Sequence, residues 1–422
     1  MILPKIMYIS KIIPIAEMNI IHTADWHLGQ TFYGYDRGRE HAVFLDWLCC
    51  TIKEYDTDLL LIAGDVFDSP NPSAEAQRAF YAFLSKVTAE NSDLQVIITA
   101  GNHDSAARLE APNSLLGVFN TSVSGVVHYK NGKPDYDRMI VPLKKGGCCL
   151  AVPYLRLNDL PAPENYSAGV SMLYNELFRK AQEMGYSPII AMGHLQASGA
   201  EVSVGDASEY AVIGGMDGVG AQFVDNGIAY TALGHLHKAQ RVARRENVRY
   251  SGAPLPMSFA ERNYRQSVTR VVLDEGGCEI DKIEFDAPVK LKSIPDKPEP
   301  IEDVIKELAS LPDGEIGDSS PYLEINVLVK AVDPTLRQQV DEALAGKSVR
   351  LARILAVSET AGTELQKAPM TYDDFKHKEP IDIMREIYTR KCNGEEMPTH
   401  LLDKLNEVIK EIRNEDIGNK GM

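Results

Sequence analysis

The fold of this chain is decided by residues 58–68, which read DLLLIAGDVFD. A continuous apolar run of this length is typical of a central strand that is covered on both faces of its sheet. The run ends at Gly64, and the carboxylate of Asp65 follows at once. In open α/β sheets, ligands bind beyond the carboxyl ends of the strands. The segment therefore predicts an α/β sheet with an acidic side chain at its ligand-binding edge.

The alternation of strands and helices continues on both sides of this segment. Residues 18–23 and 95–99 have the composition of strands, and residues 37–55 and 73–90 have the spacing of amphipathic helices. Further along the chain the pattern shifts toward strands. The strands expected there are residues 125–129, 139–143, 149–153, 188–192, 228–233, 248–251, 268–273 and 279–285, with a helix near residues 172–182. Two packed sheets flanked by helices fit this order.

Five polar clusters lie at the ends of predicted strands. They are Asp25-Trp26-His27, Gly64-Asp65-Val66-Phe67-Asp68, Gly101-Asn102-His103-Asp104, Gly193-His194 and Gly234-His235-Leu236-His237. Carboxylate, amide and imidazole groups bind divalent metal ions, and a two-metal site clamps both the attacking and the leaving oxygen of a phosphate ester. One cluster alone would be an ordinary turn or helix cap. The five in this order predict a two-metal phosphoesterase site.

The spacing within each cluster separates ligand candidates from packed neighbours. Side chains two positions apart in an extended chain point to the same side. Asp25 and His27 therefore form one pair, and His235 and His237 form another. His22 falls on the opposite side from Asp25, so we expect it to be a packed strand histidine.

Length and composition predict a globular protein of two or three domains, since 422 residues are too many for one ordinary core. The six cysteines include the adjacent pairs Cys49-Cys50 and Cys148-Cys149, a poor layout for disulfides or zinc sites. Buried, reduced thiols in a cytoplasmic protein are expected. No apolar run is long enough to cross a bilayer. The net charge of −16 counts mildly against nucleic acid, whose phosphates need local basic residues.

Composition shifts along the chain predict the domain boundaries. Residues 1–17 are expected to be an N-terminal extension without structure, and residues 18–286 to form the main domain. The proline-rich segment 293–300 marks a break. A small α+β domain, residues 287–358, is predicted from helices at 304–310 and 335–345 and strands at 322–329 and 349–357. A polar linker is expected over residues 359–378.

The tail, residues 379–416, has the pattern of two amphipathic helices. Its second helix carries a narrow apolar stripe formed by Leu401, Leu405, Val408 and Ile412. A helical pair this short cannot bury such a stripe alone. We expect it to pack on a partner, either its own domain or another protein.

The ordered clusters resemble the calcineurin-like metallophosphoesterase superfamily. Within it, Asp25-Trp26-His27-Leu28-Gly29 and Gly234-His235-Leu236-His237 are similar to the SbcD family, the Mre-type nuclease subunits of bacterial SbcC–SbcD complexes. The resemblance extends from Met18 to the tail and is strongest up to about Phe259. It implies a four-layer αββα sandwich, a small α+β capping domain and a C-terminal helical pair that binds an SbcC-type ATPase.

The resemblance also implies a role for each site residue. Two divalent ions, expected to be Mn²⁺, would be held by metal ligands from all five clusters. The ligands of the first ion would be Asp25, His27, Asp65 and His237, and those of the second would be Asp65, Asn102, His194 and His235. Asp65 would bridge the ions, with a hydroxide between them as nucleophile.

Two catalytic residues are expected beside these ligands. His103 is expected to contact a phosphate oxygen or to protonate the leaving oxygen, paired with Asp68, although some Mre-type nucleases carry histidine at that second position. Asp104 is expected either to orient His103 or to cap the following helix, and capping is favoured.

The resemblance implies a manganese-dependent DNA nuclease with 3′→5′ double-strand exonuclease and single-strand or hairpin endonuclease activity. It would act with an SbcC-type ATPase, as a homodimer of nuclease subunits, in the cytoplasm at the nucleoid. This chain has no Walker A sequence of its own. The basic residues that could contact DNA are Arg108, Lys238, Arg241, Arg244, Arg245, Arg249, Arg262, Arg265 and Arg270, and a solvated strand face is the other interpretation of each.

Two alternatives stay open at the level of sequence. The first is a two-metal phosphatase or phosphodiesterase that acts on a small molecule or a phosphoprotein. The second, of another class, is a non-catalytic scaffold that tethers DNA ends. The small second domain and the tail count against the first alternative, and the complete ligand set counts against the second.

Overall fold

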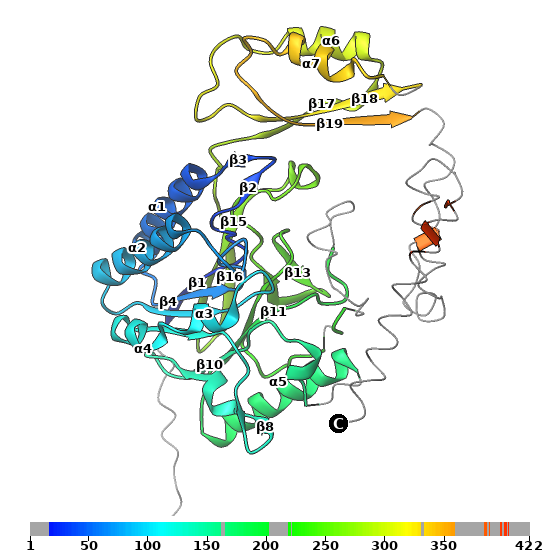
Figure 1. Ribbon diagram of the computed structural model, residues 1–422. Helices are drawn as coiled ribbons and strands as arrows, with labels where there is room; N and C mark the ends of the chain where they lie inside the picture. The colour runs from blue at the N-terminus through cyan, green and yellow to red at the C-terminus, as the bar shows by residue number, and fades with distance from the viewer. Residues whose placement is uncertain are drawn as a thin grey trace, which may run out of the picture. The chain divides into compact units, whose positions relative to one another are not determined.

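Two six-stranded sheets form the core of the larger compact unit (Figure 1). The computed structural model describes residues 17–161, 165–201, 218–220, 222–330 and 333–358, and a few positions between 384 and 404. The first sheet has the strand order β16-β15-β1-β4-β5-β6. Its strands are β1 (Met18–Thr23), β4 (Leu59–Ala63), β5 (Gln95–Thr99), β6 (Thr121–Ser124), β15 (Ser267–Asp274) and β16 (Gly277–Glu284).

The second sheet faces the first and has the order β13-β14-β12-β11-β10-β9. Its strands are β9 (Ile140–Pro142), β10 (Cys148–Ala151), β11 (Ile189–His194), β12 (Tyr230–Gly234), β13 (Gln240–Val242) and β14 (Arg245–Tyr250). Two short hairpins lie outside these sheets. They are β2 (Thr31–Phe32) with β3 (Tyr35–Asp36), and β7 (Tyr129–Lys130) with β8 (Lys133–Pro134).

The apolar run of β4 is explained by what covers its two faces. Leu60 and Ile62 join the cluster beneath the helices α1 (Gly38–Glu54) and α2 (Ala74–Glu90). Leu59 and Leu61 join the cluster between the two sheets. Burying a leucine or isoleucine stabilises the fold by roughly 1.5–3 kcal/mol, so a run buried on both sides excludes polar residues. The central strand predicted from residues 58–68 is confirmed.

The outer face of the second sheet is covered by α5 (Tyr166–Glu183). Leu173 and Leu177 of this helix pack with Leu150 and Val248 of the sheet. The layers therefore follow the order helix, sheet, sheet, helix, which confirms the predicted αββα sandwich. Two short helices, α3 (Ala106–Glu110) and α4 (Asn113–Leu116), lie along the chain between β5 and β6.

A third sheet with parallel strands follows, and Figure 1 shows its two helices on one face. Its elements are β17 (Leu291–Glu299), α6 (Ile301–Ala309), β18 (Tyr322–Val329), α7 (Leu336–Ala343) and β19 (Arg350–Ser358). Val304 and Leu308 of α6 pack with Leu323 and Ile325 of β18. We call β17–β19 with α6 and α7 the cap. The cap belongs to the same compact unit as the two large sheets.

Two predictions about secondary structure are wrong. Residues 293–300, expected to be a proline-rich break, lie mostly in β17, which is an edge strand of the cap sheet. Proline is tolerated there because an edge strand leaves one side of its backbone unpaired. Residues 125–129 were expected to form a strand, whereas the sheet strand is β6, immediately before them.

Burial confirms two predictions about single residues and corrects one. His22 is fully buried in β1, with Nδ1 2.8 Å from the Tyr230 hydroxyl, as expected for a packed histidine. The described cysteines are free, and Cys49, Cys148 and Cys149 are buried as expected. Cys50, however, is exposed, because it lies on the solvent side of α1.

Predictions for both ends of the chain lie outside the described residues. They concern the N-terminal extension (residues 1–16 of it), the linker at 359–378 and nearly all of the helical pair at 379–416. Among the described helices, none is long and apolar enough to cross a membrane.

Candidate metal centre

The five polar clusters meet at one edge of the two facing sheets. β1, β4 and β5 are adjacent and parallel in the first sheet, and β11 and β12 are adjacent and parallel in the second. The carboxyl ends of these strands therefore lie side by side. All seven predicted ligands are brought together there. They are Asp25, His27, Asp65, Asn102, His194, His235 and His237.

Several of these residues have a left-handed backbone conformation, which sets the direction of their side chains. Asp25, His27, Asp65 and His235 have φ values of 55°, 47°, 48° and 101°. Residues other than glycine rarely adopt such values, which cost about 1–3 kcal/mol each and occur mainly at functional sites. Hydrogen bonds across the two loops oppose the strain, because Asp25 N donates to Gly64 O at 3.0 Å and His27 N donates to Asp65 O at 3.0 Å.

Asp65 occupies the middle of the cluster. Its Oδ2 lies 3.2 Å from His194 Nε2 and 3.7 Å from His27 Nε2. Its Oδ1 accepts a hydrogen bond of 2.8 Å from His103 N, which fixes the carboxylate. Asn102 Oδ1 lies 3.0 Å from both His194 Nε2 and His235 Nδ1. The Asp65 carboxylate thus lies near both His194 and His27.

The residues present fit divalent metal ions. Asp25 Oδ2 and His27 Nε2 are buried without any hydrogen-bond partner, and an unpaired buried polar atom is costly. Donor atoms of Asp25, His27 and His237 lie within 4.8 Å of one another, as do those of Asp25, Asp65 and His194. Mixed carboxylate, amide and imidazole donors suit ions such as Mn²⁺ or Zn²⁺. These unpaired atoms are therefore suited to bind cations.

Outer contacts orient the imidazoles. His194 Nδ1 lies 2.9 Å from Ala63 O, which can only accept, so Nδ1 carries the proton and Nε2 is left for a ligand. His237 Nδ1 lies 2.8 Å from Glu261 Oε1, with the same consequence for its Nε2. Carbonyl and carboxylate partners of this kind fix the tautomer and the ring orientation of metal-binding histidines.

Burial and neighbouring charges shift the pKa values of the ligands in opposite directions. Burial raises the pKa of Asp25. Burial also acts to raise the pKa of Asp65, but the charge and hydrogen bond of His194, followed by His27 and His103, lower it well below the usual range. Burial acts to lower the pKa of His194, and the Asp65 carboxylate nevertheless raises it to about 9. The site thus attracts positive charge.

His103 and Asp68 contact each other, but not through the carboxylate. His103 Nδ1 lies 3.1 Å from the main-chain oxygen of Asp68. The Asp68 carboxylate is 3.3 Å from His27 Nδ1. His103 is partly exposed, whereas the metal-ligand candidates Asp25 and His194 are buried. The pairing of these two side chains in catalysis stays a prediction.

The favoured prediction for Asp104, that it caps the following helix, is wrong. Ser105, not Asp104, is the residue before α3, and no side chain caps that helix. Asp104 instead accepts hydrogen bonds from the main-chain N–H groups of Gly101, Val66 and Phe67 at 2.8, 3.2 and 2.9 Å. It therefore ties the loop after β5 to the loop after β4. Burial, followed by the charge of Asp65, raises the pKa of Asp104 to about 6.

Glu261 is a site residue that sequence reasoning missed. It lies in the short helix η4 (Phe259–Glu261), is 1% exposed and contacts His237. No local pattern marks it, because its significance depends on a histidine 24 positions earlier in the chain. A buried carboxylate would have been recognised only from its burial, which needs the fold.

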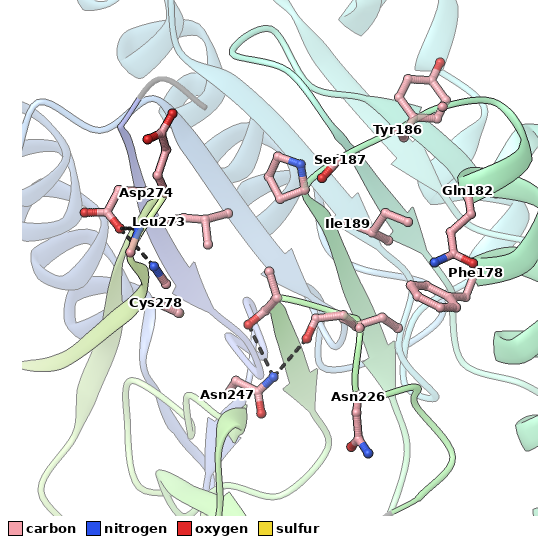
Figure 2. A pocket seen from close by; sticks show the side chains of 18 residues that line it. Phe178, Gln182, Tyr186, Ser187, Ile189, Asn226, Asn247, Leu273, Asp274 and Cys278 are labelled. Atoms are coloured by element: carbon pink, nitrogen blue, oxygen red, sulfur yellow. Dashed lines mark hydrogen bonds between the residues drawn. The ribbon is translucent and has the colours of Figure 1, made fainter. Parts of the chain in front are cut away.

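A hollow of about 830 Å³ lies elsewhere in the molecule (Figure 2). It is lined by Ile189, Ala229, Asn247 and Cys278, near the amino ends of β11, β12 and β16. Asn247 Nδ2 donates to Ile228 O at 2.9 Å, which closes part of its wall. The ligand candidates lie at the opposite ends of β11 and β12. The hollow is therefore not part of the metal centre.

Comparison with known protein families gives two matches. Residues 18–239 match the family described as "Calcineurin-like phosphoesterase". Residues 287–391 match the family described as "Type 5 capsule protein repressor C-terminal domain", which carries the short name SbcD_C. The first match covers the strands from β1 to β12 and all five polar clusters, and the second begins just before the cap.

Several curated proteins are similar to this chain, and each is the D subunit of a nuclease named SbcCD. The protein from Rhodobacter capsulatus is 37% identical over 353 residues, which cover 79% of this chain and 86% of that protein. The protein of the same name from Escherichia coli K12 is 34% identical, over 62% of this chain and 66% of its own length. The Bacillus subtilis protein of that name is 35% identical, over 60% of this chain and 66% of its own length.

The family matches agree with the geometry of the site. The converging carboxylates and imidazoles lie inside the region of the phosphoesterase match, and the cap lies inside the second match. Similarity to the Rhodobacter protein extends over most of both chains. The chain belongs to the calcineurin-like phosphoesterases and, among them, to the SbcD family of nuclease subunits.

Proposed function

We propose that this chain is a Mn²⁺-dependent DNA nuclease that binds two metal ions and works with an ATPase subunit. Its activities would be 3′→5′ exonuclease cleavage of double-stranded DNA and endonuclease cleavage of single-stranded and hairpin DNA. One observation carries the proposal: seven donor side chains from five strand ends converge, and Asp25 Oδ2 and His27 Nε2 among them are buried without a partner. Such a set suits two-metal hydrolysis of phosphate esters.

The assignment of ligands follows the two groups of donors. Asp25, His27 and His237 would hold one ion and Asn102, His194 and His235 the other, with Asp65 reaching both. Asp25 offers Oδ2, since its Oδ1 already accepts a hydrogen bond of 2.9 Å from His235 N. Bound ions would polarise the phosphate and lower the pKa of a bound water.

His103 is placed to assist the reaction with a proton. The carbonyl oxygen of Asp68 can only accept, so His103 Nδ1 carries a hydrogen and Nε2 is the nitrogen left for substrate. Its main-chain N–H is held by Asp65 Oδ1, which fixes the residue beside the bridging carboxylate. When the ring is the imidazolium, Nε2 carries a second proton, which it would donate to a phosphate oxygen or give to the leaving oxygen.

A hollow of about 530 Å³ with basic side chains supports the proposal that the substrate is a polyanion. It is lined by four basic side chains, Arg241, Arg244, Arg249 and Lys282, and by the carboxylates Glu201 and Glu246. The strand β13, which forms one wall, begins three residues after His237. Phosphodiester backbones are bound mainly by such local basic residues, even on acidic proteins.

The relatives supply the proposed partners. Their shared name describes one subunit of the SbcCD nuclease, and we propose that this chain likewise binds an SbcC-type ATPase through residues 379–416. We also propose domain boundaries at residues 18–286 and 287–358, a homodimer of the nuclease chain, and a place at the nucleoid in the cytoplasm.

A direct assay tests the proposed activity. The purified chain with Mn²⁺ should cleave hairpin, blunt and single-stranded DNA, and Mg²⁺ should support less cleavage. Asp65→Asn should abolish cleavage and lower the affinity for both ions, because both lose a ligand. Asp341→Asn, on the exposed side of α7, is the matched control and should behave as wild type.

Three results would contradict the proposal. Release of phosphate from phosphopeptides without DNA cleavage would indicate a phosphatase. DNA-end tethering without cleavage would indicate a scaffold. Two tight metal sites in the Asp65→Asn variant would remove Asp65 from its bridging place.

A further inference from the structure

A continuous chain of hydrogen bonds, nearly all of them buried, joins His237 to the cap. His237 Nδ1 bonds Glu261 Oε1 at 2.8 Å, and Glu261 Oε2 accepts from Met257 N at 2.8 Å. The neighbouring carbonyl, Pro256 O, accepts from Arg37 at 2.7 Å. The segment 256–261 therefore holds the histidine at one end and the Arg37 guanidinium at the other.

The chain continues from Arg37 into the cap. Arg37 donates to both carboxylate oxygens of Glu40, at 3.1 and 2.9 Å. The hydroxyl of Tyr322, in the cap strand β18, donates to Glu40 Oε1 at 2.8 Å. Arg37 is fully buried, Tyr322 is 1% exposed and Glu40 is 4% exposed. The links made by His237, Arg37, Glu40 and Tyr322 are therefore buried, and the link from Met257 N to Glu261 is partly buried.

Aromatic packing surrounds this chain. The Arg37 guanidinium lies over the Phe32 ring at 5.1 Å, and Phe32 packs against Tyr322 with ring centroids 4.9 Å apart. Phe259, two residues before Glu261, packs on Phe32 at 5.6 Å. From the cap, Arg353 of β19 lies over the Phe259 ring at 5.4 Å. The segment that carries Glu261 is therefore packed against the cap, directly through Arg353 and indirectly through Phe32.

We infer that Glu261, Arg37 and Tyr322 are positioning residues through which the cap sets the affinity of the ion held by Asp25, His27 and His237. The inference rests on the proposed two-metal function. Glu261 fixes the ring of His237, and Tyr322 acts at a distance through the Glu40 and Arg37 side chains. A displacement of the cap would thus be felt first at one ion and not at the other.

The physical reason is that buried charges tolerate little displacement. The carboxylates of Glu261 and Glu40 and the guanidinium of Arg37 are each taken out of water. Hydrogen bonds between Arg37 and Glu40, and from His237 and Met257 N to Glu261, compensate for the lost hydration. If Tyr322 withdraws its hydroxyl, Glu40 loses the hydrogen bond that it accepts from that group and moves toward water or toward Arg37. Arg37 then shifts against Pro256 O, and the segment that carries Glu261 moves with it.

A metal titration without DNA tests the inference. Mn²⁺ is titrated into the full-length, metal-free chain by calorimetry, and free Mn²⁺ is followed by its electron paramagnetic resonance signal. Glu261→Gln leaves one acceptor oxygen for the N–H groups of His237 and Met257, so one of these two hydrogen bonds is lost. The variant should weaken the site of Asp25, His27 and His237 by about 10- to 100-fold, the usual effect of disturbing an outer partner. The site of Asn102, His194 and His235 should keep its wild-type affinity.

Tyr322→Phe isolates the action of the cap, because it removes one hydroxyl and keeps the packed ring. It should weaken the same site by about 2- to 30-fold, the range of couplings between distant residues. In the Glu261→Gln background the Tyr322→Phe change should add nothing, since the chain is already broken. Tyr35→Phe is the matched control: its hydroxyl also bridges to the cap, to Leu351 O at 3.3 Å, but lies outside the chain.

The outcomes separate this inference from the proposed function. Two sites in the wild type and equal Mn²⁺ affinity for wild type, Tyr35→Phe and Tyr322→Phe would overturn the coupling and leave the nuclease proposal standing. Weakening of both sites alike by Tyr322→Phe, with a lowered melting temperature, would also overturn it, since that is general destabilisation. Fewer than two sites in the wild type would overturn the proposed function and the coupling together.

Discussion

At the scale of single residues, His103 is expected to act on chemistry and not on metal binding. Asn102 and Asp65 beside it supply the proposed ligands, and His103 is held by its main-chain N–H and by Nδ1. His103→Ala should keep both ions and lose about 10²- to 10⁴-fold in turnover, the usual contribution of a positioned acid. Metal titration and single-turnover cleavage measure the two quantities separately.

Asp68→Asn is the companion variant, since it leaves the main-chain oxygen that His103 contacts. If the Asp68 carboxylate also takes part, Asp68→Asn should lose less cleavage rate than His103→Ala. An unchanged rate would restrict the role of Asp68 to its main chain, and loss of an ion in His103→Ala would make His103 a ligand instead.

His22 is expected to make the fold sensitive to acid. Burial lowers the pKa of His22 from 6.5 to about 3, opposed by a main-chain contact with Leu233. The unfolded chain takes up a proton below pH 6.5, whereas the folded chain does not, so stability is full above that pH and falls as the pH drops toward 3. The loss between pH 7 and pH 5 should be about 2 kcal/mol. Urea unfolding of the metal-free chain measures it.

His22→Gln should reduce the pH dependence of unfolding by that amount, because the amide can still bond the Tyr230 hydroxyl but takes up no proton. The same slope in variant and wild type would show that His22 is not responsible.

At the scale of elements, the β13–β14 hairpin combines strain with charge. Its two turn residues, Ala243 and Arg244, have φ values of 46° and 64°, as a two-residue type I′ turn requires. Glycine would adopt this conformation without strain. Arg244→Gly should therefore raise the unfolding free energy by up to about 1 kcal/mol and yet weaken DNA binding.

Ala243→Gly is the matched control for the hairpin, because it relieves similar strain and keeps the charge. Fluorescence anisotropy against salt measures the difference: the slope of log affinity against log salt should fall by about 0.9 for Arg244→Gly alone, if it neutralises one phosphate. Equal DNA affinity for both variants would exclude Arg244 from the DNA contact.

At the scale of the whole molecule, the tail is expected to connect the chain to its ATPase partner. The stripe of Leu401, Leu405, Val408 and Ile412 needs a surface on which to bury. Leu405→Asp combined with Val408→Asp should leave Mn²⁺-dependent cleavage by the isolated chain intact, abolish co-purification with the ATPase and remove stimulation by ATP. Retained co-purification with a lowered melting temperature would instead indicate that the stripe packs on its own chain.

Much of the fold and of the site could be predicted from sequence, because their signals are local. The strands Met18–Thr23, Gln95–Thr99 and Tyr322–Val329 begin and end where the sequence predicts. Apolar runs bounded by glycine and polar residues mark strand ends, and strand ends are where an α/β sheet presents its ligands. The seven ligand candidates follow from that rule together with their order in the chain.

Other features were decided only by the tertiary structure. The hydrogen bond from His235 to Asp25 joins residues 210 positions apart, and that from Tyr322 to Glu40 joins residues 282 positions apart. Three further features depend on neighbours that are distant in the sequence. They are the hydrogen bonds of Asp104 between two loops, the contact of Glu261 with His237, and the proline-rich edge strand β17. Local sequence specifies what a segment can bury, but a buried polar group is stable only with a partner, and the fold alone determines which partner is within reach.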